Sequence, residues 1–459
     1  MRIRLTDNGK CQEPKDFKLE SSLESFRNSL DCIDGKNLGI LSEKNSKFLI
    51  YPPISKDVDL DENDIILDVD YSDKWKPRFS TGNVMGFMSL KDNVQVHITS
   101  RFDTDGKNFL LHYMLQKVCH VVFTPKTNTS EDFFYDFLYY LFPGFLNAAL
   151  KQGIYHAYVN REYNDSNVKG PIDISRHLRY NIPFNGKVTY RTREYATDNC
   201  MTQLVRHTIE FIRTLSYGRN ILNGGLDAKT RDSVKAIEQA TLSYNRNLRQ
   251  QIISKNLRPI THPYYTAYEP LRKLCVAILT HQKMSYGDSA KNQLSGILFD
   301  GASLWEEYLN VVLKENLKAN FKHPNNRSRK NAQYLFRDDE NHNRRWIFPD
   351  FIIENENVPI IMDAKYKMLD GDIGREDSFQ MLAYLFRFRS KQGFLIYPEA
   401  HDKGVHQPKT LNLYSDISVK LTTLPLVIPK PQDSFENFRS LMEKAEKELI
   451  ANRLIPVVG

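Results

Sequence analysis

Hydrophobic and polar residues alternate in several short runs near the amino terminus, which is the pattern of β-strands with one buried face. The clearest runs are KFLIYPP, DIILDVD, NVMGFMSL and VQVHITSRF, all within residues 47–102, and polar turns separate them. Residues 108–151 change to long stretches that are rich in aromatic side chains and that we interpret as helices. We therefore predict that residues 1–165 form a β-rich N-terminal domain that also holds these helices.

The helical period dominates the middle of the chain. Residues 187–195, KVTYRTREY, return briefly to strand alternation, and a helix is predicted to begin near Asp198, a plausible capping residue. Further helices are predicted over residues 228–254 and 265–284, so that residues 166–290 form a mostly helical connecting region. The helix that begins near Asp198 has an apolar stripe, which consists of Met201, Leu204, Val205, Thr208, Ile209, Ile212 and Leu215.

The last third of the chain combines both periods. A helix over about residues 300–318 is followed by two β-branched strands in FPDFIIENENVPIIMDAKYK, residues 348–367. A helix over about residues 376–390, a strand GFLIYP and a charged amphipathic helix from Ser434 complete the pattern. This order predicts a mixed α/β domain over residues 291–459, and an α+β multidomain fold for the whole chain.

Composition places the chain among ordinary globular proteins, with 41% hydrophobic and 26% charged residues in a length of 459. The apolar stretch FFYDFLYYLFPGFLNAAL is interrupted by Asp136 and Pro143, and no signal peptide precedes it. Five cysteines without paired spacing are typical of reduced thiols and disfavour a zinc cluster. We therefore expect a cytoplasmic protein with no membrane partner. The net charge of +7 permits a polyanionic binding partner.

Charged residues within the two predicted strands indicate a chemical site. Asp363 and Lys365 share one face of their strand, because side chains alternate. If residues 354–357 form the turn, Asp350 lies opposite Ile361 and diagonal to Asp363 on that same face. Buried charges require partners, and a divalent cation such as Mg²⁺ prefers carboxylate oxygens. The pattern therefore predicts a metal site that is open to substrate.

The flanking helices offer further candidates. Glu306 lies on the apolar face of its helix, and Gln380 and Tyr384 are four residues apart on one face of theirs, where they could brace the lysine or contact a phosphate. An alternative is that Glu306 is an ordinary first-turn acid stabilised by the helix dipole. Likewise, Asp350 and Asp363 could be turn-flanking acids at strand ends.

A basic loop, residues 322–346, leads into the first of the two strands and has aromatic residues between its cations. Such a loop could follow the phosphates of double-stranded DNA, although many charged loops are simply solvated. The chain contains no phosphate-binding GxxxxGK[ST] motif, so it has no predicted nucleotide site and any nucleotide-driven motor must be another polypeptide. The candidate DNA-binding residues are Arg327, Arg329, Lys330, Arg344 and Arg345.

The blocks LWEEYL, FPDF, DAKYK and SFQMLAYLF together resemble the McrC family, the nuclease subunit of McrBC-type modification-dependent (type IV) restriction systems. Weaker similarity extends through TGNVMGFMSL, VKGPIDISRHL and REYATDNCMTQLVRHTIEFI, and the resemblance covers about Thr81 to Pro398. It implies a PD-(D/E)xK restriction-endonuclease-like domain. On that basis the catalytic residues are Asp350, Asp363 and Lys365, with Glu306 as the helix-borne acid and Gln380 as the glutamine after the core.

The chemistry of phosphodiester hydrolysis agrees with these residue types. Asp350 and Asp363 would hold one or two Mg²⁺ ions, with Glu306 and the carbonyl of Ala364 as further ligands. Lys365 would position the attacking water or stabilise the developing negative charge.

The resemblance also implies a partner and a function. The partner is a McrB-like AAA+ GTPase ring, which would dock on residues 1–165 and have its hydrolysis stimulated, although a purely structural β domain shows the same pattern. The expected function is that of a Mg²⁺-dependent endonuclease subunit that cleaves DNA, with methylcytosine-containing DNA as the expected substrate. Two alternatives remain: the nuclease subunit of a related system that cuts a specific unmethylated sequence, and a non-catalytic scaffold that activates the motor.

Overall fold

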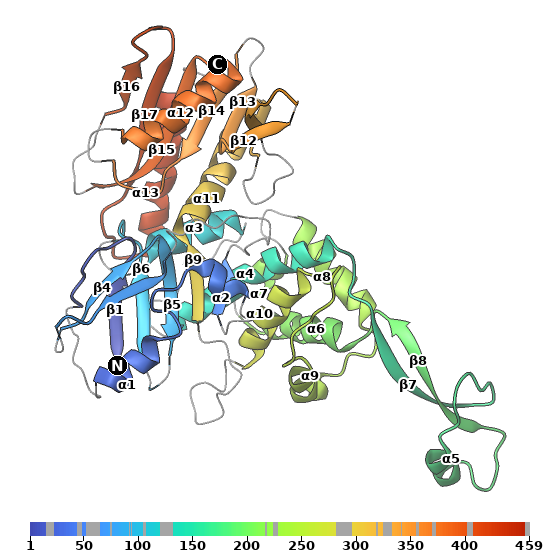
Figure 1. Ribbon diagram of the computed structural model, residues 1–459. Helices are drawn as coiled ribbons and strands as arrows, with labels where there is room; N and C mark the ends of the chain where they lie inside the picture. The colour runs from blue at the N-terminus through green and yellow to red at the C-terminus, as the bar shows by residue number, and fades with distance from the viewer. Residues whose placement is uncertain are drawn as a thin grey trace. The chain divides into compact units, whose positions relative to one another are not determined.

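The structure is a computed structural model of the chain, and it divides into two compact units. Unit 1 joins Met1–Val118, Thr124–Thr127 and Gln293–Gly459, and unit 2 joins Cys119–Phe123 and Asn128–Asn292 (Figure 1). Each unit contains both helices and strands, so the expected α+β class is confirmed. The structure describes residues 1–14, 23–43, 48–51, 65–73, 76–90, 92, 94–103, 107–119, 132–215, 218–223, 228–280, 296–317, 320–324, 333–340, 342–354, 358–369, 373–401 and 407–454.

The first sheet of unit 1 has five strands in the order β1-β6-β5-β9-β2. Three of them come from the predicted runs near the amino terminus, and β1 comes from the first six residues. The core on this sheet includes buried Ile3, Phe26 and Val96. The fifth strand, β9, comes from far along the chain and pairs antiparallel with β5 and parallel with β2. The strands are β1 (Arg2–Thr6), β2 (Phe48–Tyr51), β5 (Val84–Ser89), β6 (Gln95–Thr99) and β9 (Gly296–Asp300).

Short elements complete this part of unit 1. Strands β3 and β4 form a separate antiparallel hairpin whose Phe79 is fully buried. The elements are β3 (Leu67–Asp70), β4 (Arg78–Thr81), α1 (Leu23–Leu30), α2 (Leu38–Glu43) and α3 (Phe109–Val118).

The second sheet of unit 1 has six strands in the order β10-β13-β14-β15-β17-β16. Helix α12 packs on β14 and β15, and α13 packs on β17 (Figure 1). Met381 and Tyr384 of α12 belong to one buried cluster with Ile352 and Ile361 of the sheet. The strands are β10 (Asn320–Lys322), β13 (Phe351–Glu354), β14 (Ile360–Ala364), β15 (Gln392–Ala400), β16 (Lys409–Asn412) and β17 (Lys420–Ile428). The other elements are α11 (Gly301–Asn316), the hairpin β11 (Gln333–Arg337) and β12 (Asn343–Ile347), α12 (Arg375–Phe388), α13 (Phe435–Glu448) and the π-helix Leu449–Leu454.

Unit 2 is mainly helical and carries one long antiparallel hairpin, β7 paired with β8 (Figure 1). The helix expected from Asp198 begins at Cys200 instead, because Asn199 caps it while Asp198 accepts the N–H of Ser243 at 2.9 Å. The helix expected over residues 228–254 is interrupted, because Asn245 caps a short 3₁₀ turn and redirects the chain. The elements are α4 (Asp132–Leu150), β7 (Ala157–Asp165), α5 (Ile174–Tyr180), β8 (Val188–Ala196), α6 (Cys200–Arg213), α7 (Gly218–Leu222), α8 (Ala228–Ala240), the 3₁₀ turn Arg246–Leu248, α9 (Arg249–Lys255) and α10 (Tyr268–Thr280).

Among the described helices, none combines the length and the apolar character needed to cross a membrane.

A buried carboxylate fastens α13 to the rest of unit 1. The hydroxyls of Tyr113 on α3 and Tyr308 on α11 both donate to Oε1 of Glu446, each at 2.7 Å. Lys117 Nζ lies 3.1 Å from the other oxygen, Oε2. Three helices therefore meet at one side chain that is 5% exposed.

A second buried carboxylate, Asp7, follows β1 and makes folding pH-dependent. Burial raises its pKa to about 6, although Arg101 acts against this rise. Between its usual pKa of 3.8 and 6 the folded chain binds a proton that the unfolded chain lacks, so the stability contribution of Asp7 falls as pH rises. We expect Asp7→Asn to raise the free energy of unfolding at pH 7.5 by about 1 to 2 kcal/mol, and by less at pH 5.

Urea denaturation at the two pH values measures this difference, with the exposed Asp31→Asn as the control. An equal effect of Asp7→Asn at both pH values would contradict the expected proton uptake.

Candidate functional site

The two strands that contain the candidate acids form an antiparallel pair, β13 with β14. The register joins Phe351 to Met362 and Ile352 to Ile361, and its continuation by one position places Asp350 opposite Asp363. The expected pairing of Asp350 with Ile361 is therefore wrong by two residues. A turn over residues 354–357 would require strand pairing to resume at once, whereas β14 begins only at Ile360, after Pro359, which has no N–H to donate.

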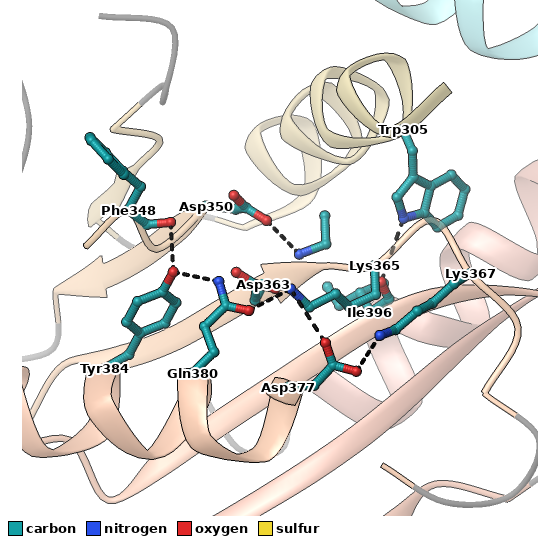
Figure 2. Close-up of polar contacts among 11 residues, drawn as sticks. Trp305, Phe348, Asp350, Asp363, Lys365, Lys367, Asp377, Gln380, Tyr384 and Ile396 are labelled. Carbon is teal, nitrogen blue, oxygen red and sulfur yellow. Dashed lines mark hydrogen bonds and ion pairs between the residues drawn. The ribbon is translucent and has the colours of Figure 1, made fainter. Parts of the chain in front are cut away.

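The two aspartates are buried, and the charge of Asp363 disfavours ionisation of Asp350. Asp350 is 7% and Asp363 is 1% exposed, and Oδ2 of Asp350 accepts the N–H of Ala364 at 2.7 Å (Figure 2). Burial, together with the negative charges of Asp363 and Glu306, raises the pKa of Asp350 well above its ordinary value. Burial also raises the pKa of Asp363, although Lys365 opposes that rise. The pair therefore holds negative charge poorly unless a cation lies close to it.

Lys365 supplies one such cation and is held by residues on two sides. Its Nζ lies 2.5 Å from Oδ2 of Asp363 and donates to Oε1 of Gln380 at 2.8 Å (Figure 2). Burial lowers the pKa of Lys365, but Asp363 and the nearby carboxylates outweigh it, so the pKa is raised. Gln380 is fixed in turn because its Nε2 donates to the Tyr384 hydroxyl at 2.7 Å, which donates to the Phe348 carbonyl at 3.1 Å. This is the bracing of the lysine that the helix spacing predicted.

Glu306 approaches the same site from α11. Its side chain is 19% exposed, and its charge contributes to the raised pKa of Asp350. His323 lies between them, with Nε2 3.6 Å from Oε1 of Glu306 and Nδ1 2.8 Å from the carbonyl oxygen of Asp350. Sequence reasoning missed this histidine, because no local pattern distinguishes it within the basic loop.

Asp377 was also missed by sequence reasoning. It is 5% exposed, and its carboxylate lies 3.8 Å from Nζ of Lys365 and 2.5 Å from Nζ of Lys367. Its position three residues before Gln380 on α12 places both side chains on one helix face, so that spacing could have identified it.

The donor atoms at the site suit a hard divalent cation. The described residues contain no cluster of three His, Cys, Asp or Glu side chains arranged around a metal position. The buried pair Asp350 and Asp363 nevertheless offers carboxylate oxygens whose raised pKa values a cation would lower again. Mg²⁺ is commonly bound by one or two carboxylates together with water and substrate oxygens. The residues therefore fit such an ion, while metal binding by Asp350, Asp363, Glu306 and the carbonyl of Ala364 stays a prediction.

The candidate DNA-binding residues are only partly covered by the structure. Arg344 and Arg345 lie on β12, where Nε of Arg344 donates to Oδ2 of Asp338 at 2.8 Å. Arg345 has a left-handed backbone with φ of 56°. Arg327, Arg329 and Lys330 lie outside the described residues. The hairpin of β11 and β12 also exposes Phe336 and Trp346, which are 60% and 39% exposed.

Comparison with known proteins gives one family match. A model of the family described as McrBC 5-methylcytosine restriction system component matches residues 79–398, a range that includes the whole site. No curated protein matches the chain.

Two solved structures from Thermococcus gammatolerans are similar to the chain. One is the refined half-complex from a tetradecameric assembly of McrB AAA+ hexamers with bound McrC, with 13% sequence identity over 97% of this chain and 100% of that chain, and a TM-score of 0.47. The other is a cryo-EM structure of the McrBC complex, with 16% identity over 70% of this chain and 90% of that chain, and a TM-score of 0.31.

Proposed function

The chain belongs to the McrBC 5-methylcytosine restriction system component family, whose model matches well over half of its length, and from this premise we propose that it is the Mg²⁺-dependent endonuclease subunit of such a system. The domain that carries the site is then of the PD-(D/E)xK type. The observation that carries this proposal is the convergence of Asp350, Asp363 and Lys365 at one buried position, with Gln380 holding the lysine.

Lys365 is suited to stabilise charge on a phosphate rather than to accept a proton. The charged carboxylates beside it raise its pKa, so Nζ keeps its proton while they are charged and acts as a donor rather than an acceptor. Its contacts with Asp363 and Gln380 fix the ammonium group in place. A fixed cation stabilises the negative charge that develops as a phosphodiester is attacked, without reorganising during the reaction.

Asp350 and Asp363 would hold Mg²⁺, and Glu306 and the carbonyl of Ala364 would complete or orient its surroundings. The bound ion would lower the pKa of a water molecule and stabilise charge on the scissile phosphate. Binding of the ion requires Asp350 to lose its proton, because its raised pKa favours the neutral acid when no cation is present.

The substrate and the partner follow from the same proposal. DNA would reach the site along the basic loop, with contacts from Arg327, Arg329, Lys330, Arg344 and Arg345. The partner is a McrB-like AAA+ GTPase ring that docks on residues 1–165 and whose GTP hydrolysis the chain stimulates. The similar T. gammatolerans assembly consists of McrB AAA+ hexamers with bound McrC, which makes a ring of this kind the first partner to test.

The test is DNA cleavage by the chain copurified with the NTPase encoded beside it. Methylated and unmethylated plasmids are compared with Mg²⁺ and either GTP or ATP, and Asp363→Ala is assayed alongside. We expect cleavage that requires Mg²⁺, the partner and Asp363, with methylated DNA preferred. Preference for a specific unmethylated sequence would identify a related system instead. Equal cleavage by the Asp363→Ala complex would place the nuclease in the partner and leave this chain as a scaffold.

Gln380→Met is expected to lower the cleavage rate by about 10- to 100-fold, the range for residues that hold a catalytic group through a hydrogen bond. Methionine fills similar space but cannot accept the hydrogen bond from Lys365. The ammonium group therefore loses one of the partners that hold it in place. Single-turnover cleavage measures the effect, and the exposed Glu376→Gln on the same helix is the control. Equal rates for the two variants would show that the lysine does not need Gln380 for its position.

A further inference from the structure

The residue that follows the candidate lysine, Tyr366, is held by the first sheet of unit 1. Its hydroxyl lies 2.8 Å from Oγ of Ser100, and its backbone carbonyl accepts a hydrogen bond from Nη2 of Arg101. Ser100 and Arg101 directly follow β6, the strand that pairs with β1 and β5. Tyr366 directly follows Lys365 beyond the end of β14 in the second sheet. The two sheets are therefore joined one residue away from the lysine.

The arginine in this joint contacts the tyrosine in more than one way. Its guanidinium carbon lies 4.8 Å from the centroid of the Tyr366 ring, and Nη2 also donates to Oδ1 of Asn83 at 3.1 Å. Its backbone N–H donates to Oδ1 of the buried Asp7 at 2.5 Å. The ring of Phe102 contacts the ring of Tyr366 edge-on, with centroids 5.3 Å apart. These contacts leave the tyrosine little freedom to shift.

The helix that carries Glu306 starts from the same place. Strand β9 of the first sheet runs without a break into α11, and the N–H of Gly301 donates to the carbonyl of Asn83 at 2.8 Å. A Cβ atom at Gly301 would lie 2.8 Å from the Tyr366 ring, so only glycine allows the helix to begin this close to it. The first sheet thus contacts both elements that supply the site, the start of α11 and the end of β14.

We propose that Ser100, Arg101 and Tyr366 form a positioning joint through which the first sheet holds Lys365 in its active geometry. This proposal rests on the nuclease function proposed above. The N–H of Lys365 donates to the carbonyl of Ile396 at 2.9 Å, and Arg101 donates to the carbonyl of Tyr366, so the backbone is held on both sides of the lysine side chain. Misplacement of a catalytic group by about 1 Å can lower a rate by about 100-fold, which makes this backbone a point of control over the reaction.

The joint predicts a specific kinetic pattern. Tyr366→Phe removes the hydroxyl and keeps the ring, and Ser100→Ala removes its partner. We expect each variant to lower kcat for DNA cleavage about 10-fold while KM for DNA stays unchanged, because the joint does not touch the substrate. The double variant should lose less than the product of the two single losses, because both changes break the contact between Ser100 and Tyr366.

Tyr71→Phe is the matched control. The Tyr71 hydroxyl has no hydrogen-bond partner in the described part of the chain, and Arg27 lies over its ring at 5.2 Å, much as Arg101 lies over Tyr366. We expect this variant to cleave at the rate of the unaltered chain. Two results would overturn the proposed positioning role of the joint. One is a loss of cleavage that parallels a loss of folded protein, and the other is an equal cleavage rate for Tyr366→Phe and Tyr71→Phe.

Amide hydrogen exchange tests the joint without any cleavage. In the full chain with its partner, exchange over residues 360–368 should become at least about 10-fold faster in Tyr366→Phe and Ser100→Ala and stay unchanged in Tyr71→Phe. Unchanged exchange in Tyr366→Phe would overturn the joint, whatever the cleavage rate. Failure of the unaltered complex to cleave DNA would instead overturn the nuclease function, and faster exchange would then remain as evidence that the first sheet holds this segment.

Discussion

Replacing Asp350 by asparagine is expected to lower the rate of DNA cleavage by about 1000-fold or more. We expect the folded chain to remain at least as stable as the unaltered one. The amide has the size of the carboxyl and can still accept the N–H of Ala364. It removes a group whose ionisation is opposed first by burial and then by the charges of Asp363 and Glu306. The loss of rate corresponds to about 4 kcal/mol, within the several kcal/mol that metal binding supplies to charge stabilisation.

Cleavage by the complex and thermal unfolding of the isolated chain measure the two effects. The exposed Asp433→Asn, in the same unit, is the control and should change neither. A variant that still cleaves DNA but melts at a lower temperature would mean that Asp350 serves the fold and not the reaction. Loss of cleavage with no loss of stability is the result that only a functional carboxylate produces.

Glu446→Leu is expected to lower the free energy of unfolding by about 3 to 5 kcal/mol, the range for removing one partner of a buried charged network. Leucine would leave the hydroxyls of Tyr113 and Tyr308 without their shared acceptor and Lys117 without its closest carboxylate. Because these residues lie on α3 and α11, the change removes contacts of α13 with two helices at once.

Urea denaturation measures this loss, and Glu443→Leu on the exposed side of the same helix is the matched control. We expect the control to differ from the unaltered chain by less than about 0.5 kcal/mol, as surface substitutions usually do. Similar losses in the two variants would indicate that leucine harms the helix itself and that the buried network contributes little.

Local patterns predicted most elements because each element buries one face. Strand alternation located β5 and β6, and α13 begins after Ser434 as expected, with the Ser434 hydroxyl accepting the N–H of Asn437 as its cap. Helix spacing likewise predicted that Gln380 and Tyr384 act together. These signals are readable because hydrophobic period and capping depend on residues close in sequence.

Features that depend on distant residues were not readable in the same way. The register of β13 against β14 is set by the length of the connection and by Pro359, which the alternation of side chains does not reveal. His323 reaches the Asp350 carbonyl only because β10 pairs with β13. The pairing of β9 with strands near the amino terminus is encoded by no local pattern. One sequence shows which faces are buried, but not which segments meet.

The position of β9 bears on how such chains can change in evolution. It lies between β5 and β2 in the first sheet and leads directly into α11, the helix that carries Glu306. The first sheet is therefore complete only when this later segment of the chain is present. A gene split anywhere between β6 and β9 would leave two unpaired strand edges in one product and an unpaired β9 in the other. We therefore expect the amino-terminal and carboxy-terminal segments of unit 1 to be inherited together. Recombination between relatives should replace unit 2 more readily than it separates these two segments.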